Sequence, residues 1–216
     1  MIECIHATHV YSGGGGVEDI NLHISKGEFV ILKGSTGAGK STLLRLLTGE
    51  ILPQSGRVQV GQIVTATASP KEICALRKQM GVVFQDGKLL VDRDCLDNVI
   101  FGLWVRGLPY RQMRPRALKI LLDVGLARLI HKKPRELSGG EQQRLAIARA
   151  LANEPLVLLA DEPLAHLDSE SAQGIMELLT KVNHRGTAII MASHREDGFQ
   201  EMSFRMLQLN RGRIVA

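Results

Sequence analysis

One glycine-rich segment constrains the fold of this chain more than any other part of its sequence. Four apolar residues at 29–32 predict a short buried strand, residues 40–47 predict a helix, and Gly49 is placed to end that helix. Between the strand and the helix, residues 34–41 have the glycine, lysine and serine spacing of a phosphate-binding loop. The segment therefore predicts a strand, loop and helix that bind a nucleotide, rather than a chance glycine-rich turn.

The chemistry of phosphate binding explains these residue types. Successive backbone N–H groups can surround a triphosphate only if the loop curls tightly, which glycine allows because it reaches positive φ. The N-terminus of the helix adds unpaired N–H groups and the positive end of a dipole. We expect Lys40 to reach the outer phosphates and the hydroxyl of Ser41 to bind Mg²⁺.

Length and composition are those of a globular protein with one sizeable core. The chain has 216 residues, of which 44% are hydrophobic, and no uninterrupted apolar run approaches membrane-spanning length. Its first residues lack the basic and then apolar pattern of a signal peptide. Cys4, Cys74 and Cys95 are far apart and odd in number, so we expect free thiols in a reducing cytosol.

Two regions before position 90 predict further sheet. Apolar residues alternate with polar ones at 20–24, which is typical of a half-buried antiparallel strand. Residues 57–64 predict another strand. A helix is expected over residues 71–79, ended by Gly81, and residues 82–84 predict a short apolar strand.

Residues 89–133 have a helical pattern, with expected breaks at 107–109 and at Pro115. This segment is also more positive than the whole chain, whose net charge is +5. Between positions 101 and 135 the acidic residue is Asp123, and the basic residues are Arg106, Arg111, Arg114, Arg116, Lys119, Arg128, Lys132, Lys133 and Arg135. Two interpretations remain open: a solvated helical face, or a surface near anionic lipid headgroups or an acidic partner.

A second glycine pair precedes another predicted helix. Ser138 and Glu141 have capping-box spacing, and the helix should run to about Asn153, with Pro155 confirming its end. The segment is either simply a well-capped helix or a second phosphate site, because two glycines before a helix N-terminus leave N–H groups open to an anion.

Charged residues follow two of the predicted buried strands. Asp161 and Glu162 come after the apolar run 156–160, and His194 follows the run 187–192. Ligands of open α/β sheets bind beyond the carboxyl ends of the strands. We therefore expect Asp161 to approach the Mg²⁺ held by Ser41, Glu162 to orient or deprotonate a water, and His194 to reach the γ-phosphate. The chain should close with a hairpin.

The order of these motifs resembles an ABC-type ATPase over nearly the whole chain. The resemblance rests on Tyr11, residues 34–42, Gln85, residues 137–141, residues 158–162, Asp168 and His194. A phosphate loop alone would also fit kinases or GTPases, whereas Leu137-Ser138-Gly139-Gly140-Glu141 is specific. The resemblance implies an α/β P-loop NTPase fold with a mainly parallel core sheet, an N-terminal antiparallel β subdomain and an inserted helical subdomain. It implies one domain over 1–216, with the core at about 1–88 and 134–216 and the helical subdomain at about 89–133.

The resemblance also implies a role for each motif residue, with ATP and Mg²⁺ as the cofactors. Tyr11 stacks on the adenine, although ordinary packing is equally compatible with this residue. Phosphates and magnesium are bound by Gly34, Ser35, Thr36, Gly37, Ala38, Gly39, Lys40, Ser41 and Thr42. Gln85 senses magnesium and the attacking water, Asp161 supports magnesium, Glu162 is the catalytic base, and His194 contacts the γ-phosphate.

A composite site is implied by the remaining motif. Ser138, Gly139 and Gly140 belong to a nucleotide site shared between two subunits of a head-to-tail homodimer. Asp168 is implied to bind the nucleotide as well. ATP closes this dimer, and hydrolysis lets it open.

Within the family, residues 82–93 most resemble the cell-division branch. This likeness implies a peripheral protein on the cytoplasmic face of the bacterial plasma membrane, whose integral membrane subunit controls peptidoglycan hydrolases. An ATPase of a lipoprotein or macrolide exporter is the nearest alternative. A subunit that binds ATP and barely hydrolyses it is disfavoured by Glu162. We expect no nucleic-acid partner, because the chain has no room for a long coiled-coil insertion or a second ATPase domain.

Overall fold

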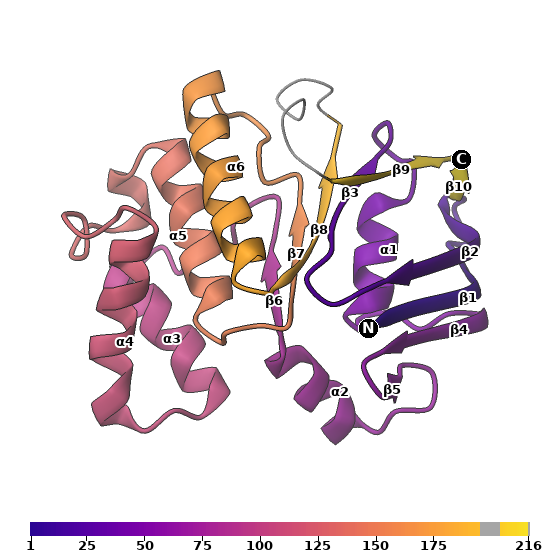
Figure 1. Cartoon of the computed structure of the whole chain (residues 1–216), viewed down its shortest axis with the longest axis horizontal. Helices are drawn as coiled ribbons and strands as arrows, with labels where there is room; N and C mark the ends of the chain where they lie inside the picture. The colour runs from indigo at the N-terminus through magenta and orange to yellow at the C-terminus, as the bar shows by residue number, and fades with distance from the viewer. Residues whose placement is uncertain (195–203, 216) are drawn as a thin grey trace.

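The computed structural model describes residues 1–194 and 204–215, which form two sheets with helices around them (Figure 1). The larger sheet has the order β10-β9-β3-β8-β7-β6, and the smaller one has the order β2-β1-β4-β5. The larger sheet contains β3 (Phe29–Lys33), β6 (Met80–Val83), β7 (Val157–Asp161), β8 (Ala188–Ser193), β9 (Arg205–Asn210) and β10 (Arg213–Val215). The smaller sheet contains β1 (Ile2–Val10), β2 (Gly16–Ile24), β4 (Ser55–Val60) and β5 (Ile63–Val64).

The larger sheet is mainly parallel and has a separate core on each face. Strands β6, β7, β8, β3 and β9 pair in parallel, and β10 adds an antiparallel edge. Along β8, Ile189 and Met191 belong to one core, and Ile190 and Ala192 to the other. Side chains alternate across a strand, so a run that is apolar at every position must be covered on both faces.

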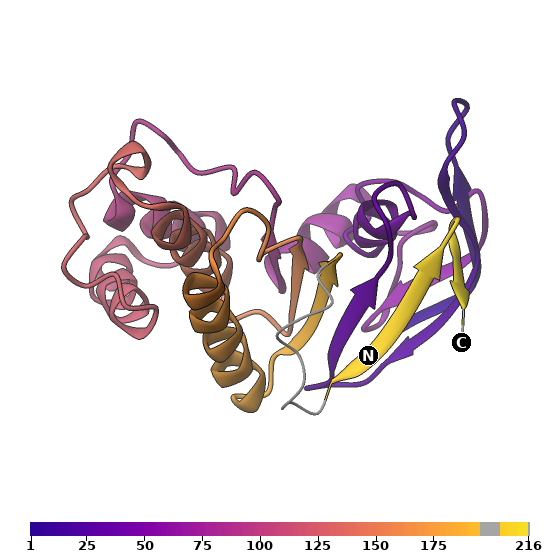
Figure 2. The same ribbon diagram turned by 90° about the horizontal axis from the view of Figure 1, so that it is seen from above.

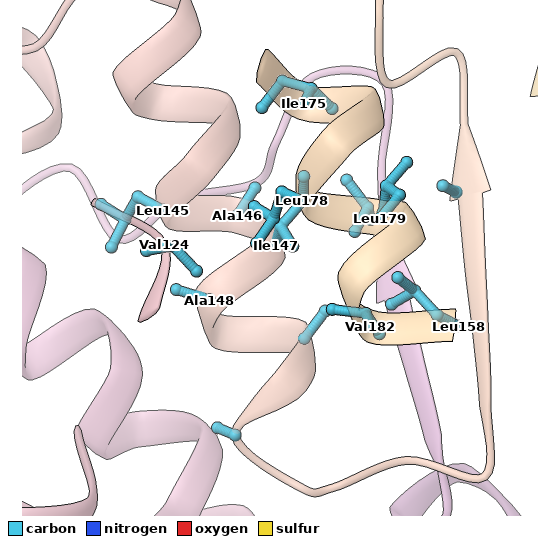
Figure 3. Close-up of a cluster of buried hydrophobic side chains, with 14 of the residues drawn as sticks. Val124, Leu145, Ala146, Ile147, Ala148, Leu158, Ile175, Leu178, Leu179 and Val182 are labelled. Atoms are coloured by element: carbon cyan, nitrogen blue, oxygen red, sulfur yellow. The ribbon is translucent and has the colours of Figure 1, made fainter. Parts of the chain in front are cut away.

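Helices cover one face, and a helix with the smaller sheet covers the other (Figures 1 and 2). The helices are α1 (Lys40–Leu47), α2 (Pro70–Lys78), α3 (Cys95–Arg106), α4 (Tyr110–Asp123), a short 3₁₀ helix η1 (Pro134–Glu136), α5 (Gly139–Leu151) and α6 (Ser169–His184). Apolar residues of α5 and α6 pack together against the β7 side chain of Leu158 (Figure 3). Helix α1 packs on the opposite face, in the core that also contains β1 and β2. None of the helices within the described residues is long and apolar enough to cross a membrane.

The fold class predicted from the sequence is confirmed, as is the final hairpin, which forms from β9 and β10. Residues 57–64 are not one strand, because the chain turns at Gly61 (φ +61°) and β5 folds back on β4. The helix before β6 ends at Lys78, so Gly81 does not end it and lies inside β6. A Cβ at Gly81 would lie 2.8 Å from the carbonyl oxygen of Ala150, so glycine here allows α5 to approach the strand closely.

Within residues 89–133, the observed helices cover less of the segment than predicted, and they are interrupted at 107–109 but not at Pro115. Pro115 lies inside α4 and does not break it, and residues 124–133 form turns. Proline removes one helical N–H and leaves the carbonyl of Arg111 without that donor, but both residues are exposed, so water can satisfy the carbonyl.

Candidate nucleotide site

The phosphate-loop motif forms the turn between β3 and α1, and its glycines are required by close backbone contacts. Gly39 caps α1 with φ +106°, and a Cβ there would lie 2.3 Å from the carbonyl oxygen of Gly16. A Cβ on Gly34 would lie 2.5 Å from the carbonyl oxygen of Leu209. Side chains at these positions would force the loop away from β2 and β9, so neighbouring strands hold its curvature.

Lys40 is buried at the start of α1, and its charge is fully engaged. Its Nζ donates to the carbonyl oxygens of Gly34 (2.6 Å) and Ser35 (3.2 Å), and it lies 3.1 Å from Oε1 of Glu162. A buried ammonium needs such partners because removing it from water is costly. The lysine therefore joins the phosphate loop to the carboxyl end of β7.

Asp161 ends β7 and faces α1. Burial raises the pKa of its carboxyl group, and the charge of Glu162 raises it further, whereas a hydrogen bond with the Ser41 side chain lowers it. Its Oδ1 atom is buried and has no hydrogen-bond partner among the described residues. A buried carboxylate oxygen without a donor is costly, and a bound cation would relieve that cost.

Glu162 follows Asp161 and is held in a strained backbone conformation. Its φ is +49°, in the left-handed region that a glutamate rarely occupies. Its Oε2 lies 2.7 Å from Nδ1 of His194 and accepts the backbone N–H of His194 at 3.2 Å. Since β7 and β8 are parallel neighbours, the residues after them meet at one edge of the sheet. Glu162 is thus fixed between a cationic side chain and an imidazole.

These groups surround a cavity of about 480 Å³ at that edge. Of the residues predicted from sequence, its lining contains Thr36, Gly37, Gly39, Lys40, Ser41, Thr42, Gln85, Asp161, Glu162 and His194. Sequence reasoning missed Gly15, Gly16, Ala165 and His166, which also line it. The sequence signal that points to Gly16 is the run of four glycines at positions 13–16. Its Cβ would lie 2.2 Å from the carbonyl oxygen of His9, so this position requires glycine.

Some predicted residues lie beside the cavity rather than in its described lining. Gly34, Ser35 and Ala38 belong to the loop but do not line the cavity. Tyr11 is partly exposed, its ring meets the ring of His9 edge-on at 4.9 Å, and its hydroxyl accepts a hydrogen bond from Arg45 (3.2 Å).

The residues of the second motif lie elsewhere, at two adjacent helix N-termini. Ser138 and Glu141 form the predicted capping box of α5, and Asp168 caps α6 by accepting the backbone N–H of Ser171 at 2.8 Å. A Cβ on Gly140 would lie 2.9 Å from Oγ of Ser171, so the two N-termini are in contact. Neither Ser138, Gly139, Gly140 nor Asp168 is among the described residues that line the cavity of Lys40.

Helix α5 also contacts the segment that follows Gln85, through a residue that sequence reasoning did not identify. The guanidinium of Arg149 donates to the carbonyl oxygens of Gly87 (2.7 Å) and Lys88 (2.5 Å). Burial lowers the pKa of Arg149, and the charge of Asp86 opposes that shift. Helix α5, whose N-cap is Ser138, is therefore hydrogen-bonded directly to the segment after Gln85.

The family model described as ABC transporter matches residues 17–165, which contain the phosphate loop, the second motif and both carboxylates. This chain belongs to the ABC transporter ATPase family. As a member of that family it is an ATPase and binds ATP. A dimeric structure of the ATP-binding cassette MJ0796, in a post-hydrolysis state bound to ADP and Pi, matches with a TM-score of 0.88 and 34% identity, covering 100% of this chain and 97% of that one.

Two curated relatives of this ABC ATPase have different names. The cell division ATP-binding protein FtsE of Mycobacterium tuberculosis is 43% identical over 100% of this chain and 94% of its own length. The lipoprotein-releasing system ATP-binding protein LolD of Aquifex aeolicus is 39% identical over 100% of this chain and 97% of its own length. The predicted resemblance to the cell-division branch of the family is confirmed, and the similarity to LolD is nearly as high.

Proposed function

We propose that this ATPase is the nucleotide-hydrolysing subunit of an FtsE-like cell-division complex, with Glu162 as its catalytic base. The observation that carries the catalytic assignment is the placement of Glu162 between Lys40 and His194 in the phosphate-loop cavity. The names and full-length coverage of the FtsE relatives support the cell-division role.

Magnesium fits the oxygen-donor set at the end of β7. Ser41 supplies a hydroxyl, Asp161 has a buried oxygen without a donor, and Gln85 adds an amide oxygen in the same cavity. Mg²⁺ prefers such hard oxygen ligands and keeps its remaining positions for water and phosphate oxygens. When bound there, Mg²⁺ would neutralise charge on the β- and γ-phosphates.

The steps of ATP hydrolysis can then be assigned to individual residues of the chain. Phosphate oxygens compete for the ammonium of Lys40, which frees Glu162 from its ion pair. Glu162 accepts a proton from the attacking water, a new bond forms between the water oxygen and the γ-phosphorus, and the bond to the bridging oxygen of ADP breaks. His194 contacts the carboxylate of Glu162 through Nδ1, and we assign to it the contact with the transferred phosphate. The phosphate-loop residues and Tyr11 hold the nucleotide.

Glu162→Gln is the test of this assignment, because glutamine keeps the size of the side chain and loses its basicity. We expect ATP turnover to fall by at least about a hundredfold, while ATP binding stays within about threefold. The matched control is Glu177→Gln on the exposed face of α6, which should leave turnover unchanged. Measurements are steady-state phosphate release and equilibrium ATP binding. A Glu162→Gln variant with normal turnover would exclude Glu162 as the base.

The membrane partner that we propose is an integral subunit similar to FtsX. A cleft of about 540 Å³ lies beside the nucleotide cavity, and Ser41 and Asp161 line both, together with Phe84 and Lys88 in the cleft. Because Arg149 holds the Gly87–Lys88 carbonyls, movement of this segment can pass between the cleft and α5. We also place residues 89–133, proposed as the helical subdomain, at this membrane-facing side, where the exposed side chains of Arg111 and Arg114 can meet anionic lipid.

Exposed aromatic residues support an interface on the same subdomain. Phe101 and Trp104 of α3 stack with their ring centres 6.1 Å apart, and Trp104 is 64% exposed. Aromatic residues of this kind are enriched at protein interfaces and at membrane surfaces. Peripheral attachment to the cytoplasmic face of the plasma membrane follows from this proposed partner.

The identity of the membrane subunit distinguishes the two candidate complexes. A tagged Glu162→Gln variant, loaded with ATP, serves as bait in detergent-solubilised membranes, and captured subunits are identified by mass spectrometry. Recovery of an FtsX-like subunit supports the cell-division role. Recovery of an exporter permease, as the similarity to LolD also allows, would overturn it and leave the ATP site assignment standing.

Charge reversal tests the proposed docking surface. Arg111 and Arg114 are exposed on α4, whereas Arg116 is paired with Glu154 and is unsuited to this test. We expect Arg111→Glu with Arg114→Glu to reduce membrane recruitment by several-fold without changing soluble ATP turnover. Unchanged recruitment would remove this part of α4 from the interface.

A further inference from the structure

A second cavity of about 480 Å³ lies at the opposite edge of the larger sheet from the nucleotide site. It is bounded by α4, by the turn before β7 and by the C-terminal part of α6. Leu156 lines it just before β7, whereas Asp161 lies at the other end of that strand. At roughly 3.3 Å per residue, the two positions are about 16 Å apart. The two cavities are therefore separate.

The floor of this cavity is apolar. Val124, Leu178 and Val182 belong to the buried hydrophobic cluster drawn in Figure 3, and all three also line the cavity. Ile120 and the partly exposed Leu156 extend the apolar surface. A volume of this size lies within the range of small-molecule sites, which run from about 300 to 1,000 Å³.

The wall of the cavity is positively charged. Four basic side chains line it, Arg116, Lys119, Lys181 and Arg185, against two acidic ones, Asp123 and Glu154. Both carboxylates are already paired: Asp123 lies 3.0 Å from Arg185, and Glu154 pairs with Arg116 and with Arg106 at 3.4 Å. Within the described residues, the side-chain ammonium groups of Lys119 and Lys181 have no ion pair or hydrogen bond. The site thus presents two uncompensated ammonium groups, one on α4 and one on α6, beside an apolar floor.

We propose that this cavity binds a small soluble anionic amphiphile. Its carboxylate, phosphate or sulfonate group is held by Lys119 and Lys181, and its apolar body rests on the Val124, Leu178 and Val182 surface. The cavity is sized for one molecule, which favours a soluble ligand over a membrane surface. Because the two lysines come from different helices, a bound ligand also links α4 to α6. This site does not depend on the proposed cell-division role.

The test uses anilinonaphthalene sulfonate, a fluorescent molecule with one sulfonate and an apolar ring system. Its neutral analogue N-phenylnaphthylamine lacks the sulfonate and reports apolar binding alone. We expect the sulfonate probe to bind the full chain saturably. Lys119→Gln with Lys181→Gln should weaken that binding by about tenfold and leave the neutral probe unaffected. The matched control, Lys26→Gln with Lys71→Gln, removes two exposed lysines elsewhere and should bind both probes like wild type.

Three results would overturn the proposal. The first is equal affinity of the sulfonate probe for the Lys119/Lys181 variant and the control variant. The second is displacement of the probe by ATP, which would place it in the nucleotide cavity. The third concerns the source of the anion: if the Lys119/Lys181 variant alone loses cosedimentation with phosphatidylglycerol vesicles, the lysines bind a membrane surface. A soluble ligand is supported if the two variants bind the vesicles equally and only the Lys119/Lys181 variant loses affinity for the sulfonate probe.

Discussion

At the residue scale, the three free cysteines differ sharply in their chemistry. Burial raises the pKa of the Cys4 thiol to about 12 and that of Cys95 to about 11, whereas Cys74 is exposed. Because the thiolate is the reactive form, iodoacetamide at about pH 8 should alkylate Cys74 and spare the other two until the chain unfolds. Mass spectrometry of native and denatured samples checks this, and rapid native alkylation of Cys4 would contradict it.

The raised pKa of Cys4 also predicts a pH dependence of stability. The unfolded thiol ionises near its ordinary value of 9.0 while the folded thiol stays protonated, so this contribution to stability is complete below about pH 9 and declines as the pH rises toward 12. Cys4→Ala lacks it. Between about pH 8 and pH 10, denaturant unfolding of wild type should therefore lose about 1 kcal/mol more than that of the variant. An equal loss in both proteins would contradict the assignment.

At the element scale, two helices begin with the same capping box but have different expected roles. Ser69 on α2 and Ser138 on α5 each accept the N3 backbone N–H at 3.3 Å, and their own N–H groups donate to a glutamate at 2.8 Å. Alanine at either serine should cost about 1 kcal/mol of unfolding free energy. ATP turnover should fall at least about tenfold in the Ser138→Ala variant and stay unchanged in the Ser69→Ala variant. Equal turnover in both variants would leave Ser138 as a cap only.

At the scale of the whole molecule, the two motifs predicted to bind phosphate lie in separate places, and from this separation we predict a dimer. The described lining of the Lys40 cavity lacks Ser138, Gly139 and Gly140, so we expect a second chain to bring its own copy of that motif to the cavity. Glu162→Gln with ATP should sediment as a dimer, and adding Ser138→Arg should return it to a monomer. Adding Ser69→Arg should not, because α2 carries no nucleotide motif. Persistent dimers with Ser138→Arg would exclude the composite site.

Much of the fold followed from short stretches of sequence. The phosphate loop, the capping box of α5 and the apolar strand before Asp161 are each determined within about ten residues, by backbone preference, local hydrogen bonds and apolar pattern. Where the local sequence predicted the wrong structure, a contact with a residue far away in the chain was the cause. Gly81 looked like a helix terminator, but its role is to let the Ala150 carbonyl approach β6.

Residue type and local spacing were enough to identify residues that could bind phosphate, carry charge at a strand end or begin a helix, because these properties depend on the residue and its immediate neighbours. The contacts of Glu162 with Lys40 and His194 could be found only in the folded chain. The same holds for the packing of Gly16 on Gly39 and for the hydrogen bonds of Arg149 to the segment after Gln85. These contacts join residues far apart in the chain, and they exist because parallel strand pairing and helix packing bring the elements together.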